Sequence, residues 1–438
     1  SLLVRDQDLI GIIANIDNNI ITGFIFSSLV DNCLPCQTKI TTPKQTCNIF
    51  IFRVDLFLKH RYKIAMEPFK NVYNPDSVTS LAHHIKLNYP QFKSKDFLKT
   101  IIKEIHTLEL KERVNLITNT LESYLPKDYD VAVKVLINSL APINDDSKID
   151  SNQANGITGF LVWPLTNYIS AFGLDHFETS MHALEELTKR FTAEFAIRFF
   201  INHNTSASYK YLNKWSKSKN FHLRRLSSEG CRPNLPWGIK LQNTEKILSF
   251  NIKILNRLQN DPELYVRKSV ANHLNDISRI DEKLFFNTVN SFNSHHSNTQ
   301  WIIRHASRSL LKKGHPKALK LHDYKKIDPT KINLKLSDKE VEIGSSIKLK
   351  VVLKFDPKDK QKKILIDYIL GFNKNNGKIS EMAFRLKDTI IPDNCILTIE
   401  KDISFKPVTT RKLYPGNHTV KIQVNGKKSL ENKFKLLQ

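Results

Sequence analysis

The chain has 438 residues, enough for two or three domains that each bury a core of their own. Lysine and arginine number 67 against 43 aspartate and glutamate residues, so the net charge is +24. Such an excess favours a polyanionic partner, above all nucleic acid, over a surface adapted only for solubility. The sequence contains no run of 18 or more uninterrupted apolar residues, and it therefore predicts no membrane-spanning helix.

The five cysteines are an odd number spread along the chain, which favours a reducing compartment over a disulfide framework. Cys33 and Cys36 form a C-x-x-C pair near Cys47, but a fourth ligand is missing, and we expect no metal site there. Residues 1–65 precede Met66, a candidate initiator. They are interpreted as an uncertain N-terminal extension without an assigned function.

Helical periodicity dominates the first half of the chain. Apolar residues recur at helical spacing over residues 76–124, and Asn74 supplies a cap before them. A polar loop rich in Asp, Ser and Asn is expected at residues 144–159. Helix resumes near Trp163, and residues 181–200 are predicted to form one long amphipathic helix.

Three later segments each place an arginine after a hydrophobic stretch, at Arg224, Arg267 and Arg304. These arginines are 43 and 37 residues apart, which is the period of HEAT and armadillo repeats. Because stacked helix pairs place equivalent residues along one edge, the arginines would form a row that follows a nucleic-acid backbone. The alternative is that each is an independent residue paired with a neighbouring carboxylate.

The pattern changes to a period of two beyond residue 328, which predicts a β-sandwich of about 100 residues over 328–438. The sequence LYPGNH at residues 413–418 looks like the tyrosine-bearing corner of immunoglobulin-like domains. A DNA-clamping role and a solubilising role for this region both stay open. Strands are expected at residues 347–353, 363–370, 396–399 and 419–424.

The most informative segment is residues 223–237, with the sequence LRRLSSEGCRPNLPW. Arginine offers a fixed fork of donors to phosphate oxygens, and a carboxylate beside an aromatic face attracts a cation. Spacing alone also allows a helix end followed by a proline turn with a core tryptophan. Walker, GxGxxG, HExxH and GxSxG motifs are absent from the sequence, which leaves nucleotide hydrolysis, dinucleotide redox chemistry and the common hydrolases without support.

This segment resembles the DNA alkylation-repair glycosylases with HEAT-like repeats, specifically their AlkC branch. Three other segments share the resemblance: MEPFK at residues 66–70, TKRFTAEFAIR at 188–198 and WIIRHA at 301–306. The resemblance implies a mostly α fold, with a HEAT-like helical-repeat solenoid as the glycosylase domain at 66–327. A C-terminal immunoglobulin-like β-sandwich follows at 328–438.

The resemblance also implies an activity, hydrolysis of the N-glycosidic bond of cationic alkylated bases in duplex DNA. The bases would be N3-methyladenine and N3-methylcytosine, and the reaction would initiate base excision repair. A carboxylate can stabilise the oxocarbenium-like sugar and orient or deprotonate the attacking water. The expected partner is double-stranded DNA with alkylated bases. We expect no cofactor, metal or membrane, a monomer and a cytoplasmic location.

Three carboxylates are carried over as catalytic candidates: Glu194, Glu229 and Asp276. Glu229 is the first choice because it lies one turn beyond Arg225 and just before the proline turn. The substrate-binding candidates are Trp237, Trp163 and Arg225. The candidates for binding DNA phosphates are Arg224, Arg232, Arg267 and Arg304.

Several of these assignments have structural alternatives. Trp163 fits a core position better than a binding site, and Asp276 and Glu194 also fit cap and surface positions. Arg225 can instead be the internal ion-pair partner of Glu229. Two other functions stay open, a non-catalytic HEAT-like DNA-binding protein and a basic protein-interaction scaffold.

Overall fold

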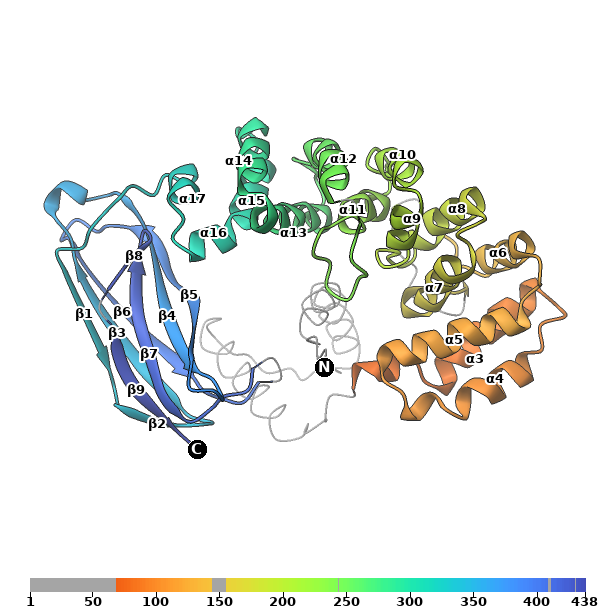
Figure 1. Ribbon diagram of the computed structural model, residues 1–438, viewed down its shortest axis with the longest axis horizontal. Helices are drawn as coiled ribbons and strands as arrows, with labels where there is room; N and C mark the ends of the chain where they lie inside the picture. Colours follow the sequence, from red (N-terminus) through yellow and green to blue (C-terminus); the bar gives the residue numbers. More distant parts are fainter. Residues whose placement is uncertain (1–67, 144–154, 243, 409–410, 430) are drawn as a thin grey trace, which may run out of the picture. The chain divides into compact units, whose positions relative to one another are not determined.

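The computed structural model describes residues 68–438 except 144–154, 243, 409–410 and 430 (Figure 1). The predicted extension at residues 1–65 and the C-x-x-C pair lie outside the described residues, as does most of the predicted polar loop. The chain divides between Ala196 and Ile197 into two compact units. In the part of the chain that is described, no helix is long and apolar enough to cross a membrane.

The first unit is helical. Its helices are η1 (Phe69–Val72), α3 (Pro75–Asn88), α4 (Ser94–Ile102), η2 (Ile105–Thr107), α5 (Leu110–Tyr124), α6 (Tyr129–Asn138), η4 (Gly159–Leu161), α7 (Val162–Phe172) and α8 (Phe177–Thr188). The predicted cap at Asn74 is confirmed, because its side chain accepts a hydrogen bond from Ser77 N at 2.9 Å. The Ser77 hydroxyl accepts in turn from Asn74 N at 3.0 Å, which completes a capping box.

The prediction of one helix over residues 181–200 is wrong, since α8 ends at Thr188 and the next helix begins at Ile197. Thr192 explains part of the break. Its hydroxyl accepts a hydrogen bond from Glu194 N at 3.3 Å, a local bond that competes with helix formation. The apolar spacing continues through the break, which is why periodicity did not reveal it.

The second unit starts with helices that extend to residue 321. They are α9 (Ile197–His203), α10 (Thr205–Trp215), α11 (Phe221–Glu229), α12 (Thr244–Arg257), α13 (Leu264–Ile280), α14 (Glu282–Ser291), α15 (Ser297–Ala306), α16 (Arg308–Lys312) and α17 (Pro316–Leu321). Helix α11 packs against α13, and α13 packs against α15 (Figure 1). The three predicted repeat arginines therefore lie on three successively packed helices.

The predicted C-terminal β-sandwich is present. Its strands are β1 (Lys331–Leu336), β2 (Glu340–Glu342), β3 (Ser346–Lys354), β4 (Lys363–Asn373), β5 (Ile379–Ile390), β6 (Ile396–Ser404), β7 (Gly416–Val424), β8 (Lys427–Lys428) and β9 (Asn432–Leu437). One sheet has the order β1-β3-β6 and the other β2-β9-β7-β4-β5, with β8 paired to β7. The four strands expected from the sequence lie within β3, β4, β6 and β7 and are confirmed.

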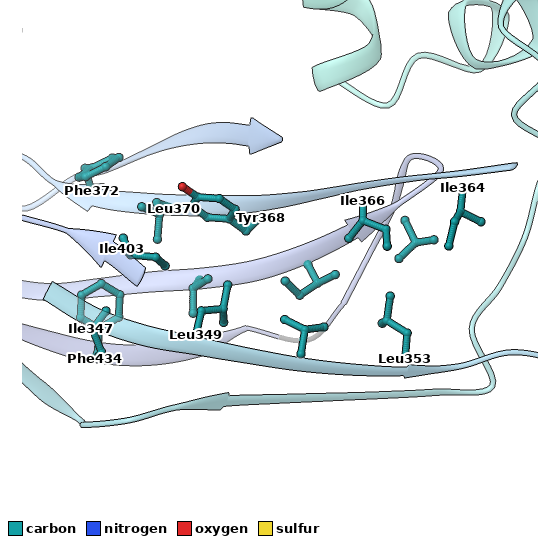
Figure 2. Packing of buried hydrophobic residues seen from close by; sticks show 14 of the residues in the cluster. Ile347, Leu349, Leu353, Ile364, Ile366, Tyr368, Leu370, Phe372, Ile403 and Phe434 are labelled. Atoms are coloured by element: carbon teal, nitrogen blue, oxygen red, sulfur yellow. The ribbon is translucent and has the colours of Figure 1, made fainter. Parts of the chain in front are cut away.

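Alternate residues of the two sheets fill the sandwich core, as the period of two requires. Figure 2 shows Ile347, Leu349 and Leu353 of β3 in this core together with Ile366 and Leu370 of β4. All five side chains are at most 4% exposed. In β3 the apolar alternation seen in the sequence is therefore the inward face of the strand, whereas β4 is buried on both faces.

The tyrosine corner expected at residues 413–418 is not formed. Such a corner needs a hydrogen bond from the tyrosine hydroxyl back to the main chain. Here the Tyr414 carbonyl instead accepts a hydrogen bond from His418 Nε2 at 3.0 Å. Among the residues described, the Tyr414 hydroxyl has no hydrogen-bond partner, and the buried ring of His418 contacts Phe405 and Phe434.

The helices and the sandwich of the second unit meet at two glycines. Gly314 and Gly426 have φ angles of +71° and +87°, and a Cβ atom added to Gly314 would lie 2.6 Å from Gly426 Cα. The side chain of Gln423 donates to Lys312 O at 3.2 Å beside them. A side chain at Gly314 would thus meet backbone atoms that cannot move independently.

Gly314→Ala is expected to destabilise the second unit by at least about 2 kcal/mol, because it adds backbone strain and a steric clash. Gly344→Ala is the matched control. Gly344 also has a positive φ, +103°, but nothing lies within 4 Å of an added Cβ, so strain alone is added. Urea denaturation of the full chain measures both variants, and equal losses would contradict the close approach.

Candidate active site

The sequence of residues 223–237 forms the end of helix α11 and the turn after it. The helix begins at Phe221 and is capped by Asn220, whose side chain accepts hydrogen bonds from the backbone of His222 and Leu223. Leu226 and Glu229 are three residues apart and share the buried face of the helix. The Glu229 carboxylate is consequently only 2% exposed.

Arg198 of helix α9 fixes the turn. Its Nη1 donates to Gly230 O at 3.0 Å and to Arg232 O at 2.8 Å, and its Nε donates to Ile239 O at 2.7 Å. These bonds join the beginning of the turn to its end. Gly238 allows the close packing, because a Cβ there would lie 3.0 Å from Arg198 Nε. Sequence reasoning included Arg198 in a motif but gave it no role.

Arg232 bridges two of the three predicted carboxylates. Its Nη1 donates to Glu229 Oε1 at 2.6 Å, and its Nε donates to Asp276 Oδ2 at 2.9 Å. Arg225 places a second guanidinium 3.6 Å from the same Glu229 oxygen, so the ion-pair alternative for Arg225 is present in the structure. The guanidinium of Arg232 faces carboxylates inside the protein, which does not favour the predicted phosphate contact.

The two carboxylates have different acidities. Burial raises the pKa of Glu229, but Arg232, Arg225 and a hydrogen bond with Ser269 together outweigh it and hold the pKa at about 2. Burial also raises the pKa of Asp276. The charge of Arg232 lowers this pKa by less than burial raises it, so the pKa stays above its ordinary value. Glu229 is therefore a fixed anion, whereas Asp276 accepts a proton more readily.

The two carboxylates also differ in the number of guanidiniums that they face, two for Glu229 and one for Asp276. Glu229 Oε1 faces both guanidiniums. Asp276 binds Arg232 through Oδ2, and its Oδ1 accepts no hydrogen bond from any residue in the described part of the chain. This geometry favours Asp276, rather than the first-choice Glu229, as the group that contacts a water molecule or a sugar.

A buried polar network behind the carboxylates was missed by sequence reasoning. His273 Nδ1 donates to Ser228 O at 2.9 Å, and His273 Nε2 accepts from Asn251 Nδ2 at 2.9 Å. The Tyr209 hydroxyl donates to Asn251 Oδ1 at 2.5 Å. Burial, followed by the charge of Arg232, lowers the pKa of His273 to about 3, so the ring is neutral as this network requires.

The spacing within helix α13 contained a signal for this network. Ser269, His273 and Asp276 are four and three residues apart, which places them on one helix face. That face packs against α11, and all three side chains are buried. A polar stripe on the buried face of an amphipathic helix indicates a polar site in the interior.

Trp237 has an unusual backbone conformation. It is half-buried and has a φ of +66°, a strained value for a bulky side chain. Strain of this kind persists only where the surrounding contacts hold it, and it is concentrated at functional sites. The conformation therefore supports a functional role for the indole.

Glu194 and Trp163 belong to the first unit. Glu194 is 3% exposed, and its Oε2 accepts a hydrogen bond from Thr192 Oγ1 at 2.8 Å. Trp163 is 4% exposed and packs against Phe195, with the ring centroids 5.5 Å apart. Trp163 therefore occupies a core position, which was the structural alternative to a binding role. Glu194 is buried, so the alternative of a surface position does not apply to it.

The three repeat arginines all have partners within the second unit. Arg224 forms a bidentate pair with Asp261, at 2.6 and 3.0 Å. Arg267 donates to the Asp261 carbonyl at 2.9 Å, and Arg304 pairs with Asp388. These contacts favour the structural alternative most strongly for Arg224, whose guanidinium is already matched by a carboxylate.

The described residues contain no group of three or more His, Cys, Asp or Glu side chains that could hold a metal ion. Cys231, two residues after Glu229, is buried and forms no disulfide with any described residue. Burial raises the pKa of its thiol to about 12, so it is not a reactive thiolate. The chemistry available here is that of carboxylates and guanidiniums.

Comparison with known proteins shows which family has a similar sequence and fold. The model of the DNA alkylation repair enzyme family matches residues 184–310, and that of the YhaZ C-terminal Ig-like domain matches residues 330–438. The chain is 36% identical over 363 residues to the uncharacterized protein YhaZ of Bacillus subtilis (strain 168), covering 82% of this chain and 97% of YhaZ.

Its fold is similar to a solved structure of the Pseudomonas fluorescens alkylpurine DNA glycosylase AlkC bound to DNA containing an abasic site analog. The TM-score is 0.77 at 31% identity, over 84% of this chain and 99% of that chain. The chain belongs to the AlkC branch of the DNA alkylation repair enzymes. The resemblance inferred from the sequence is thus confirmed, with a helical AlkC-like region followed by an immunoglobulin-like domain.

Glu229→Gln is expected to destabilise the second unit by about 3–5 kcal/mol at pH 7, because Arg225 and Arg232 would lose their buried counter-charge. The folded pKa of about 2 lies below the ordinary value of 4.5. The stabilisation by Glu229 is therefore complete above pH 4.5 and is lost as the pH falls towards 2.

Urea denaturation of wild type and variant at pH 7 and pH 3 tests this expectation, with the exposed Glu245→Gln of helix α12 as the control. The difference in unfolding free energy should shrink at pH 3 for Glu229→Gln only. A difference that is the same at both pH values would contradict the depressed pKa.

Proposed function

We propose that the chain is a DNA glycosylase that hydrolyses the N-glycosidic bond of cationic alkylated bases in duplex DNA and so initiates base excision repair. The bases are N3-methyladenine and N3-methylcytosine. Membership of the AlkC branch supports the reaction class, and the net charge of +24 suits a duplex. The observation that carries the proposal is Asp276, a buried carboxylate oriented by Arg232 with one oxygen unused by the protein.

The reaction needs little activation of the leaving group, because the alkylated base already carries a positive charge. As the bond from C1′ to the base nitrogen breaks, its electron pair moves to the base, which leaves neutral, and positive charge develops on the sugar. Asp276 stabilises that charge through Oδ1, the oxygen that does not bind Arg232. The oxygen of a water molecule bonds to C1′ while Asp276 accepts the water proton and later releases it to solvent.

The neighbouring residues have supporting roles in this proposal. Glu229 provides the counter-charge that keeps Arg232 and Arg225 in place, so that Arg232 orients Asp276. Trp237 stacks on the alkylated base or its sugar. Glu194 is a further carboxylate of the proposed catalytic set, and no metal or cofactor takes part.

We also propose the domain organisation. Residues 66–327 form the glycosylase domain, in which the pairs α10–α11, α12–α13 and α14–α15 are HEAT-like repeats of a solenoid. Residues 328–438 form the immunoglobulin-like domain. The active species is a cytoplasmic monomer.

Asp276→Asn is expected to lower the single-turnover release of N3-methyladenine from methylated duplex at least about 100-fold, because the amide neither stabilises the cation nor accepts a proton. The wild-type rate should rise with pH as Asp276 deprotonates, through an apparent pKa above the ordinary aspartate value of 3.8. Chromatography of the released base, in buffer containing EDTA, measures both.

Asp281→Asn is the matched control, since Asp281 is an exposed cap of the adjacent helix α14. It should retain the wild-type rate. A rate for Asp276→Asn within threefold of wild type would remove Asp276 from the reaction. Wild-type protein that binds duplex but releases no base would favour the non-catalytic DNA-binding alternative, and failure to bind duplex would favour the protein scaffold.

A further inference from the structure

Arg308 of helix α16 is a half-buried arginine whose hydrogen bonds go to neutral acceptors. Its Nη1 donates to His305 O at 2.8 Å, and its Nη2 donates to Asn272 Oδ1 at 2.9 Å. No carboxylate within the described ranges forms an ion pair with it. Because a guanidinium carries five N–H donors and one positive charge, Arg308 keeps donors and charge for a further partner.

Arg308 lines a cavity of about 210 Å³ together with Trp301, Arg304, His305 and Arg385. Helix α15 contributes three of these side chains, and strand β5 contributes Arg385. The rings of Trp301 and His305 stack with centroids 5.0 Å apart and planes 9° apart. The cavity is several times larger than the volume of one water molecule, about 30 Å³.

The carboxylates around this cavity do not balance its arginines. Arg304 pairs with Asp388. Arg385 pairs with Asp367 at 2.7 Å and lies 3.9 Å from Asp388. Asp388 and Asp367 therefore neutralise Arg304 and Arg385. The third guanidinium of this cavity, that of Arg308, has no carboxylate partner among the described residues.

The acidities of two lining groups indicate a positive local potential. Burial, followed by the charges of Arg232 and Arg279, lowers the pKa of Arg308 to about 10. Burial, followed by the charges of Arg308 and Lys268, lowers the pKa of His305 to about 4. Both shifts disfavour the cationic forms, and an anion in the cavity would favour them again.

We propose that this cavity is a phosphate-binding site, in which Arg308 and His305 hold the phosphate group and Arg304 and Arg385 flank it. A phosphate presents several acceptor oxygens and matches guanidinium and imidazole donors that converge from α15, α16 and β5. The stacked ring of Trp301 offers an apolar wall for an attached sugar. A backbone phosphate of DNA and a free phosphate share this chemistry.

With DNA as the ligand, the inference rests on the proposed glycosylase function and adds to it a specific phosphate contact. The site adjoins the helix that carries a proposed catalytic carboxylate, since Arg308 donates to Asn272 of α13, four residues before Asp276. It shares Arg304 with the arginine row expected from the sequence, whereas Arg308, His305 and Arg385 were not part of that row.

Arg308→Met is expected to weaken binding of undamaged duplex about tenfold and to reduce the salt dependence of the binding constant by about one unit, since one phosphate contact is lost. Arg257→Met is the matched control. Arg257 also donates to neutral acceptors, Asn213 Oδ1 at 2.6 Å and Ser216 Oγ at 2.7 Å, but it is not among the residues that line this cavity. Its removal should leave the salt dependence unchanged.

The pKa of His305 in the wild-type full chain, followed by NMR, provides a test that does not depend on a variant folding. Inorganic phosphate and undamaged duplex are added separately at constant ionic strength. A rise from about 4 with both probes supports the site with free phosphate as a ligand, and a rise with duplex alone supports it with backbone phosphate only.

No rise with either probe would overturn the proposal, as would an Arg308→Met variant whose duplex affinity and salt dependence equal those of wild type. Base release is measured separately. A wild-type chain that releases no base but shows the His305 shift would refute the glycosylase function and leave the phosphate site in place.

Discussion

The bridge from Glu229 through Arg232 to Asp276 is the interaction on which the rest of the candidate site depends. Two carboxylates from different helices are buried side by side, an arrangement that is unstable without a cation between them. Arg232 supplies that cation, and Arg198 fixes the turn from which it extends. The bridge thus links three features: the packing of α11 on α13, the conformation of the turn and the charge balance of the two carboxylates.

The same bridge separates the roles of the two carboxylates. Glu229 faces two guanidiniums and stays ionised, so it acts best as a counter-charge. Asp276 shares only one guanidinium and keeps an oxygen for another partner. The sequence offers both residues as candidates but contains no information on how many cations each one faces. The choice between them requires the distances.

The sequence predicted the features that depend on a local pattern of residues. Strand alternation located β3, β4, β6 and β7, and an unusual motif indicated the family. It could not predict contacts between distant segments. The pairing of Arg224 with Asp261 depends on which helix ends meet, and the helix break before Ile197 depends in part on the Thr192 hydroxyl, which accepts a hydrogen bond from the main chain. Nor did charge counting show that Arg308, among the arginines lining its cavity, lacks a carboxylate partner in the described part of the chain.

A double-mutant cycle on single-turnover base release tests most directly whether Glu229 and Asp276 act as one unit through Arg232. The rates of Glu229→Gln, Asp276→Asn and the double variant are compared with wild type on methylated duplex. We predict that the double variant loses no more activity than the more damaging single variant, because either change disables the same unit. A loss equal to the product of the two single losses would show that the carboxylates act independently and would contradict this view of the site.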